Sequence, residues 1–388
     1  MRYSCGLLRS VPCGRSLLAF VLLLSAVGCS GPRLHLPIRP SLGAWPTERG
    51  SADNRGSVSG SIGEMRLLWR TRTGGLAAGE PTVSGGVLYF PGLDRRLEIV
   101  SIADGRRLWR TRFRGPVTAA VARADGFDVL TDQDELRYLI FHRDPLRLAA
   151  SFPVIACRAA PRLINDSLIL LAAYNGSIAC RTRGGDLVWE THTLGPILTA
   201  PALVDSVAYV ASGRQVIALS TTDGTILWTH RSSGAIGAAP AVGNLVYVGS
   251  ADSLVYALDR RNGAMAWFFA AGAGVFTTPA VGGDRLFFGA NDGYIYALNE
   301  STGRLLWRYN TGAIANLPCT LVGNSVLVSS RNNRLLVLDA ADGRLIGEHK
   351  LLAPATTPPI VAAGRVFVAD TKRNLYCFGS VRDSLKNP

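Results

Sequence analysis

The chain has 388 residues, of which 48% are hydrophobic and 18% are charged, and its formal net charge is +13. This composition belongs to a folded protein with a substantial core and excludes the profile of a disordered chain. Length alone allows one domain or several, so internal repetition has to decide between them.

The first 28 residues form a predicted signal peptide. They contain Arg2, Arg9 and Arg15 and no acidic residue, and the apolar run 17–27 follows. A basic stretch, a short apolar stretch and small residues before a cleavage site are typical of a secretory signal, whereas a membrane-spanning helix needs about 20 apolar residues. We therefore expect an exported protein, for which nucleic acid is not a partner.

Cleavage in front of Cys29 would create an N-terminal cysteine of the kind that the lipoprotein pathway acylates. The preceding Ala26-Val27-Gly28 also suits an ordinary signal peptidase, which would leave Cys29 as a free thiol. We expect lipidation at Cys29 and a membrane tether. Residues 29–61 then comprise the attachment cysteine, the tether and a lead-in segment. If the cell has two membranes, Ser30 after the cysteine favours transport to the outer membrane.

A repeat of about 40 residues fills most of the remaining chain. Six tryptophans are spaced by 40, 80, 39, 39 and 40 residues: Trp69, Trp109, Trp189, Trp228, Trp267 and Trp307. A glycine precedes each of the last five by four residues, and Gly343 continues the series: Gly105, Gly185, Gly224, Gly263, Gly303 and Gly343. Short alternating runs and Asp-Gly, Asn-Gly and Gly-Asn turns predict four strands per repeat.

The repeats predict a closed ring. Eight strand starts occur, at Pro81, Ala119, Pro161, Pro201, Pro240, Pro279, Cys319 and Pro358. The last repeat lacks its Gly-to-Trp strand, and the strand 66–72 has no earlier strands of its own. We therefore predict an all-β, eight-bladed β-propeller of four-stranded antiparallel blades over 62–380, closed by pairing of the N- and C-terminal strands, with a tail at 381–388.

The repeat resembles a known motif. Residues 257–267 read A-L-D-R-R-N-G-A-M-A-W, which is similar to the tryptophan-docking motif of quinoprotein-like (PQQ-like) β-propellers, and 218–228 and 297–307 follow it with Ser220 and Asn299 at the Asp position. The segment 45–50 resembles the W-P-x-x-R-G start of the same superfamily. The resemblance implies that the tryptophans and glycines fasten neighbouring blades together.

Catalysis is not expected. Catalytic quinoproteins bind pyrroloquinoline quinone with calcium, and this chain lacks their long insertions and the adjacent cysteine pair often found over the quinone. The five histidines have no metal-ligand spacing, and no phosphate loop or nucleophile elbow is present. The acidic stretch Asp125, Asp128, Asp132, Asp134 and Glu135 is predicted to be a solvated surface loop. We predict no catalytic residue, no metal and no cofactor, and small buried thiols at Cys157, Cys180, Cys319 and Cys377.

In size, export signal and blade number, the chain resembles the BamB family of outer-membrane assembly lipoproteins. The resemblance implies a non-catalytic scaffold on the periplasmic face of the outer membrane, with a protein partner in the β-barrel assembly machinery. It places partner contacts at Leu194, Ile197, Leu198 and Ile236, which are then expected to be exposed, although the Arg and Asp expected among such contacts are missing. The alternative is that these residues only pack between neighbouring blades. The alternatives are a propeller that binds a small molecule or glycan in its funnel, and a quinone-dependent dehydrogenase.

Charge predicts a second surface. Arg66, Arg70 and Arg72 alternate with Trp69 on one outermost strand, and Arg110, Arg112 and Arg114 alternate with Trp109 on that of the next blade. Alternation places each set opposite its tryptophan. We predict a basic rim patch that meets an anionic membrane or an acidic partner; the alternative is that charge only discourages strand pairing at the edge.

Overall fold

The computed structural model describes residues 46–47, 49–123, 125–132, 137–143, 146–155, 157 and 159–380. Every regular element within these ranges is a β-strand. No helix with the length and apolarity needed to cross a bilayer occurs in this part of the chain. The predicted signal peptide, Cys29, Trp45 and the tail 381–388 lie outside the described residues.

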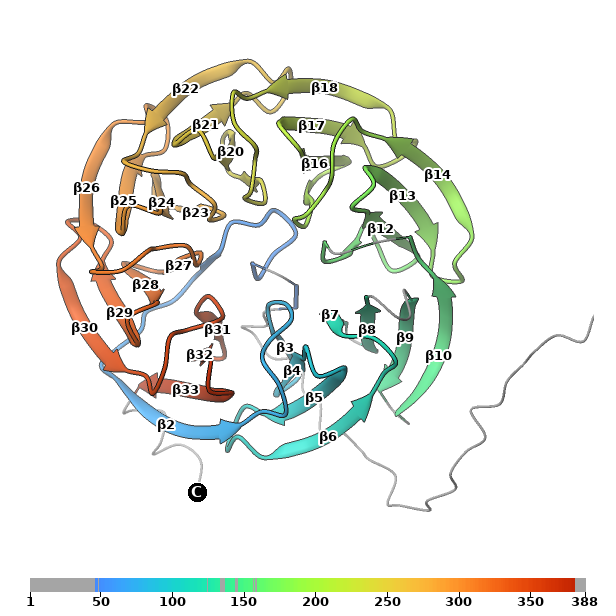
Figure 1. Ribbon diagram of the computed structural model, residues 1–388, viewed down its shortest axis with the longest axis horizontal. Helices are drawn as coiled ribbons and strands as arrows, with labels where there is room; N and C mark the ends of the chain where they lie inside the picture. Colours follow the sequence, from blue (N-terminus) through green and yellow to red (C-terminus); the bar gives the residue numbers. More distant parts are fainter. Residues whose placement is uncertain are drawn as a thin grey trace, which may run out of the picture. The chain divides into compact units, whose positions relative to one another are not determined.

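Eight antiparallel sheets form the predicted propeller (Figure 1). The first four complete blades are β3 (Thr82–Ser84), β4 (Val87–Pro91), β5 (Arg96–Ser101) and β6 (Arg107–Arg112); β7 (Val117–Ala122), β8 (Gly126–Thr131), β9 (Arg137–Arg143) and β10 (Leu146–Pro153); β11 (Arg162–Leu163), β12 (Leu168–Ala172), β13 (Ser177–Thr182) and β14 (Leu187–His192); and β15 (Ala202–Val204), β16 (Val207–Ser212), β17 (Gln215–Ser220) and β18 (Ile226–Arg231). The next three are β19 (Ala241–Val242), β20 (Val246–Gly249), β21 (Leu254–Leu258) and β22 (Met265–Ala270); β23 (Ala280–Gly282), β24 (Arg285–Gly289), β25 (Tyr294–Asn299) and β26 (Leu305–Asn310); and β27 (Thr320–Val322), β28 (Ser325–Ser330), β29 (Arg334–Asp339) and β30 (Leu345–Lys350).

The eighth blade joins the two ends of the propeller, as predicted. It contains β31 (Ile360–Ala362), β32 (Arg365–Ala369) and β33 (Asn374–Ser380), and its outermost strand is β2 (Met65–Arg72). The antiparallel register pairs Met65 with Ser380 and Arg72 with Asn374. Figure 1 shows β2 in blue beside β33 in red. We call this sheet the closure blade.

One short strand was not predicted. β1 (Ser57–Val58) pairs in parallel with β27 and makes that sheet five-stranded. β1 belongs to the lead-in segment, so this segment is hydrogen-bonded into the ring.

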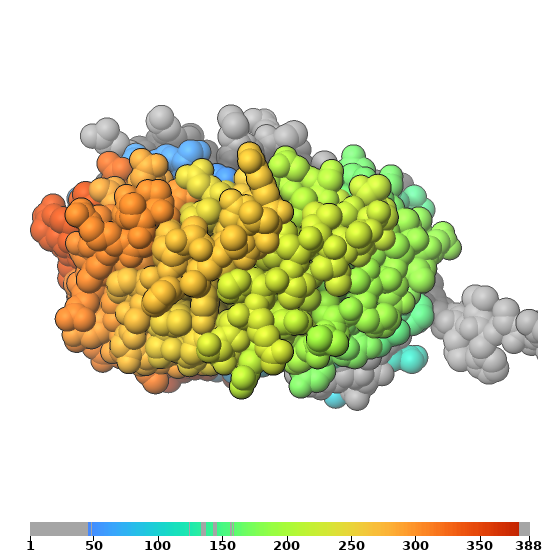
Figure 2. Space-filling model, turned by 90° about the horizontal axis from the view of Figure 1, so that it is seen from above, coloured from blue at the N-terminus to red at the C-terminus, as the bar shows by residue number. Residues whose placement is uncertain are grey.

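The core lies between blades. The middle strands are buried on both faces, as β20 is along its whole length, whereas the outermost β22 alternates between exposed and half-buried positions. One apolar cluster joins Phe287 and Trp307 to Val326 and Leu336 of the next blade. Figure 2 shows the rim edge-on, with the blades side by side from green to orange. Each blade is therefore covered by its two neighbours, which explains the long apolar runs in the sequence.

The four predicted buried thiols are confirmed. Cys157, Cys180, Cys319 and Cys377 are all buried and unbridged. Burial raises the pKa of Cys157 to about 12 and that of Cys319 to about 11. These thiols are therefore protonated and unreactive at neutral pH.

Candidate functional site

The lead-in segment occupies the centre of the ring. Backbone N–H groups of four successive innermost strands donate to its carbonyls: Leu203 to Ala52, Val242 to Asp53, Val281 to Arg55 and Leu321 to Gly56. In Figure 1 the segment runs in blue across the middle of the propeller. It therefore ties together blades that are far apart in sequence.

Buried polar side chains hold the segment in place. Asn54 is fully buried and donates to the carbonyls of Ala200 (3.2 Å) and Pro240 (3.0 Å), while its amide oxygen accepts from Arg162. Arg49 is also buried and donates to the carbonyl of Cys319 (2.8 Å). These side chains satisfy carbonyls that the innermost strands would otherwise leave unpaired.

Gly56 is required by this packing. Its φ is +58°, and a Cβ atom there would lie 1.7 Å from the Arg49 guanidinium. Any side chain would therefore displace the buried arginine and strain the backbone.

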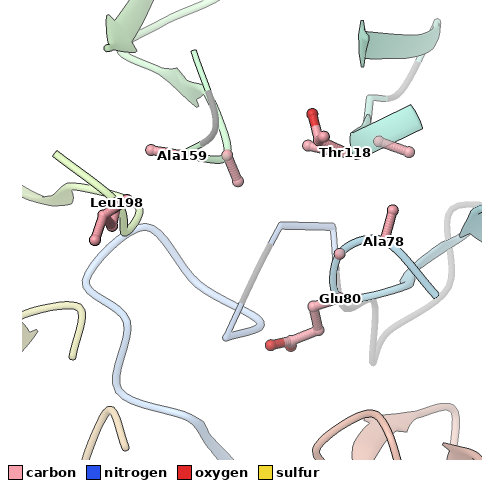
Figure 3. A pocket seen from close by; sticks show the side chains of 9 residues that line it. Ala78, Glu80, Thr118, Ala159 and Leu198 are labelled. Atoms are coloured by element: carbon pink, nitrogen blue, oxygen red, sulfur yellow. The ribbon is translucent and has the colours of Figure 1, made fainter. Parts of the chain in front are cut away.

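A pocket of about 180 Å³ lies beside the lead-in segment (Figure 3). Its walls come from the loops leading into β3, β11 and β15 and from the start of β7, and they are mostly alanine and glycine: Ala78, Gly79, Glu80, Thr118, Ala119, Ala120, Ala159, Ala160 and Leu198. Glu80 supplies the one carboxylate and accepts a hydrogen bond from the Arg49 backbone N–H (2.9 Å).

This lining does not fit a calcium-bound quinone. Calcium takes six to eight oxygen ligands, and the pocket offers one carboxylate and one hydroxyl side chain. Across the described ranges, no group of three or more His, Cys, Asp or Glu side chains could hold a metal ion.

The two ends of the ring differ in character. The long connections between blades lie at the same end of the ring as the turns between the second and third strands of each blade. Two backbone hydrogen bonds show this, because the N–H of Thr193 donates to the carbonyl of Gly176 and the N–H of Ser232 donates to the carbonyl of Arg214. We call this end the loop face. It carries eight exposed large apolar residues: Leu93, Ile155, Tyr174, Leu194, Leu198, Phe276, Ile314 and Leu352. The described turns at the opposite end carry none, since the other exposed large apolar residues lie on outermost strands.

The four predicted partner contacts divide into two groups. Leu194 is 92% exposed and Leu198 is 50% exposed, and both lie on the loop face. Ile197 and Ile236, in contrast, are buried in apolar clusters between blades. The expectation that all four are exposed needs correction, because the two isoleucines face the core and offer no surface to a partner.

The tryptophans and glycines meet across blade boundaries. The Trp228 indole N–H donates to the carbonyl of Arg260 in the next blade (3.0 Å), and a Cβ atom at Gly263, where φ is +70°, would lie 2.5 Å from the Trp228 ring. The same pair of contacts occurs for Trp69 with Gly105, Trp189 with Gly224, Trp267 with Gly303 and Trp307 with Gly343.

The irregular blade β7–β10 departs from this pattern. Trp109 faces it and makes edge contacts with Phe127 and Phe141 instead of meeting a glycine turn. Phe152 on β10 takes the place of the missing tryptophan, because its ring lies against Gly185 of the next blade. Sequence reasoning missed Phe152, although it is an aromatic residue a few positions past the place that the 40-residue period predicts.

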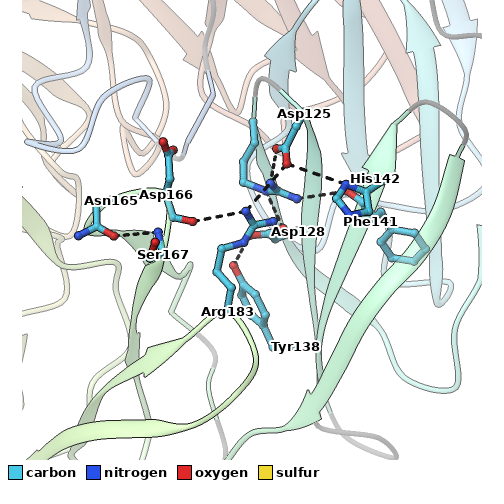
Figure 4. Close-up of polar contacts among 10 residues, drawn as sticks. Asp125, Asp128, Tyr138, Phe141, His142, Asn165, Asp166, Ser167 and Arg183 are labelled. Carbon is cyan, nitrogen blue, oxygen red and sulfur yellow. Dashed lines mark hydrogen bonds and ion pairs between the residues drawn. The ribbon is translucent and has the colours of Figure 1, made fainter.

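The acidic stretch in this blade is not simply a surface loop. Asp128 on β8 is fully buried and accepts from Arg123 (2.8 Å) and from the Tyr138 hydroxyl (2.6 Å). Figure 4 shows Asp128 and Tyr138 among the neighbouring polar residues. Burial raises the pKa of Asp128, and Arg123 opposes this shift. Asp125 contacts Arg123 near the surface, while Asp134 and Glu135 lie outside the described residues. The prediction of a solvated loop is therefore wrong for Asp128, which is part of a buried ion pair.

The sequence matches a known protein family along most of its length. The sequence profile of the family described as "Outer membrane protein assembly factor BamB" matches residues 63–153, 157–242, 231–321 and 310–382. The chain belongs to the BamB family. No curated protein sequence matches it.

Solved structures share the fold at low sequence identity. BamB from Moraxella catarrhalis is 15% identical with a TM-score of 0.70, covering 82% of this chain and 98% of that one. The computationally designed protein Ika8 is 16% identical with a TM-score of 0.69, covering 80% and 98%. The quinohemoprotein alcohol dehydrogenase from Comamonas testosteroni is 11% identical with a TM-score of 0.73, covering 88% and 81%. Because the last is an enzyme and the second a design, the shared fold does not decide between BamB-like and other functions.

Proposed function

We propose that this chain is a non-catalytic scaffold of the cell envelope that assists the assembly of outer-membrane β-barrel proteins. Membership of the BamB family supports this proposal. The observation that carries it is the contrast between a lead-in segment that is hydrogen-bonded to four innermost strands at the centre of the ring and a loop face with eight exposed large apolar side chains. We take these exposed side chains as the candidate contact surface for a protein partner.

The pocket argues against the rival functions. Glycans and small polar ligands are held by convergent polar and aromatic side chains, whereas this pocket is walled mainly by alanine. A quinone-dependent dehydrogenase would need oxygen ligands that the lining does not supply.

The proposed location follows from the predicted signal peptide and from lipidation of Cys29. A lipid-tethered, exported propeller would work on the periplasmic face of the outer membrane, beside the β-barrel assembly machinery. Mass spectrometry of the mature N-terminus tests this step, since an acylated Cys29 differs in mass from a free thiol.

Affinity purification from detergent-solubilised envelope tests the scaffold role. We expect a barrel-assembly protein to co-purify with the wild-type chain, and Leu194→Asp with Leu198→Asp to reduce its recovery at least tenfold. The matched control is Ile226→Asp with Leu227→Asp, two exposed apolar residues on the rim strand β18. Equal recovery with both double variants would remove the loop face from the proposal.

A second arm of the same purification adds pyrroloquinoline quinone and calcium. Retention of the quinone without any protein partner would overturn the scaffold role and favour catalysis.

A further inference from the structure

The basic rim patch is a continuous feature of two neighbouring blades. Its six arginines are all exposed: Arg66, Arg70 and Arg72 on β2, Arg110 and Arg112 on β6, and Arg114 just beyond β6. The two strands are adjacent on the rim, because the Arg107 side chain of β6 donates to the carbonyl of Arg72 on β2 (3.1 Å). β2 belongs to the closure blade, so the patch forms only when the ring is closed.

Five of the six arginines have no acidic partner in the part of the chain that the structure describes. These five are Arg70, Arg72, Arg110, Arg112 and Arg114. Neighbouring arginines behave differently, since Arg107 pairs with Glu98 (3.2 Å) and Arg96 with Asp94 (2.9 Å). These five arginines therefore present positive charge that the described residues leave uncompensated.

Protection of the strand edges does not explain this concentration of charge. If charge served only to prevent pairing, the other outermost strands would need it equally. Yet β22 has the sequence MAWFFA with no charged residue, and β14 and β18 have one each. The arginines gather on one arc of the rim, which points to a binding partner at that arc.

We propose that the basic rim patch binds an anionic lipid surface. Guanidinium groups pair well with phosphate oxygens, and a row of them along two strands matches a surface that repeats the phosphate group. Leu67 lies within the patch and is 49% exposed, so it adds an apolar side chain that can enter the headgroup region. An acidic protein would account for the arginines but not for Leu67 among them.

This contact would turn the rim toward the membrane and leave the loop face at the side, open to a protein partner. The inference does not depend on the proposed function, because it rests on charge and exposure alone. Attraction of this kind acts within a Debye length of about 8 Å at physiological salt, so it requires the rim to touch the surface.

Vesicle flotation tests the proposal. The chain carries Cys29→Ser so that no acyl group contributes, and the vesicles contain either phosphatidylcholine alone or phosphatidylcholine with phosphatidylglycerol. We expect binding to the phosphatidylglycerol vesicles only, and its loss in 1 M salt. Because each arginine near an anionic surface contributes about fivefold, Arg70→Glu with Arg110→Glu and Arg112→Glu should lower the partition coefficient about 100-fold.

The matched control changes the net charge equally at scattered exposed sites: Arg231→Glu, Arg261→Glu and Arg304→Glu. The control should retain most of the binding, and thermal unfolding of both triple variants verifies that they fold. An equal fall in both variants would assign the binding to net charge and overturn the proposal. Absence of any preference for anionic vesicles at low salt would overturn it too.

Discussion

At the scale of single residues, each regular blade boundary joins a tryptophan to a glycine of the next blade. Glycine is required at this position for two reasons. The turn needs a positive φ, and the absence of a Cβ atom leaves room for the indole ring. Trp307 combines these contacts with burial, since it is 9% exposed, donates to the Ala340 carbonyl (3.0 Å) and packs against Gly343.

Replacing Trp307 by alanine should therefore destabilise the protein. We expect Trp307→Ala to lower the free energy of unfolding by about 3 to 5 kcal/mol, as truncation of buried aromatic residues does. Trp307→Phe retains much of the packing and loses the hydrogen bond, and should cost less. Urea unfolding measures both variants. A cost for alanine within the range of a surface substitution would remove Trp307 from the blade contacts that stabilise the ring.

The buried Asp128 makes stability depend on pH in a defined direction. Burial is the main reason that its pKa is raised above the ordinary value of an aspartic acid side chain. The folded state therefore binds this proton more tightly than the unfolded state, and the resulting stability is present at low pH and is lost as the pH rises through the folded-state pKa. Asp128→Asn should remove this contribution, so the difference in unfolding free energy between wild type and variant should move in favour of wild type as the pH falls from 7 to 4. A difference that moves the other way would mean that Arg123 outweighs burial.

At the scale of elements, the lead-in segment is hydrogen-bonded to more blades than its sequence predicts. Strands were predictable from alternation and turn residues, but the segment 46–58 has little regular pattern. Many of its hydrogen bonds join it to residues more than 100 positions away, as for Asn54 with Ala200. Long-range hydrogen bonds of single side chains leave no periodic signal. The resemblance of 45–50 to a superfamily start indicated the segment but not its path.

Asn54→Ala should loosen the innermost strands. The substitution removes donors to two carbonyls and leaves the buried Arg162 guanidinium without its amide partner, at an expected cost of about 2 to 4 kcal/mol. Amide hydrogen exchange locates the effect: Leu203 and Val242, which donate to the lead-in segment, should exchange faster. The middle-strand amide of Val248 serves as the internal control and should be unchanged below global unfolding.

At the scale of the whole molecule, closure of the ring explains which blade joins the chain ends and why one repeat lacks its tryptophan. Eight repeats and complementary half-repeats at the chain ends predicted the closure blade. The same closure explains why β30 has Gly347 where the repeat expects tryptophan: β33 and β2 come from opposite ends of the chain, so no glycine turn joins them. The loop face was harder to predict, because period and spacing do not show that Ile197 turns inward while Leu194 points out.

Pairing of β2 with β33 should control the unfolding of the entire ring, since it is the one blade held together without chain continuity between its outer strands. A disulfide from Arg72→Cys and Asn374→Cys, which are register partners, would close a loop of about 300 residues. Chain entropy predicts stabilisation of about 6 kcal/mol for a loop of this size. The reduced form of the same variant is the control, and Cys157, Cys180, Cys319 and Cys377, the thiols that the structure describes, are buried and should not compete. Denaturant unfolding with equal midpoints for both forms would mean that opening begins at another blade boundary, for which the boundary between Trp109 and the irregular blade is the first candidate, because there no tryptophan meets a glycine.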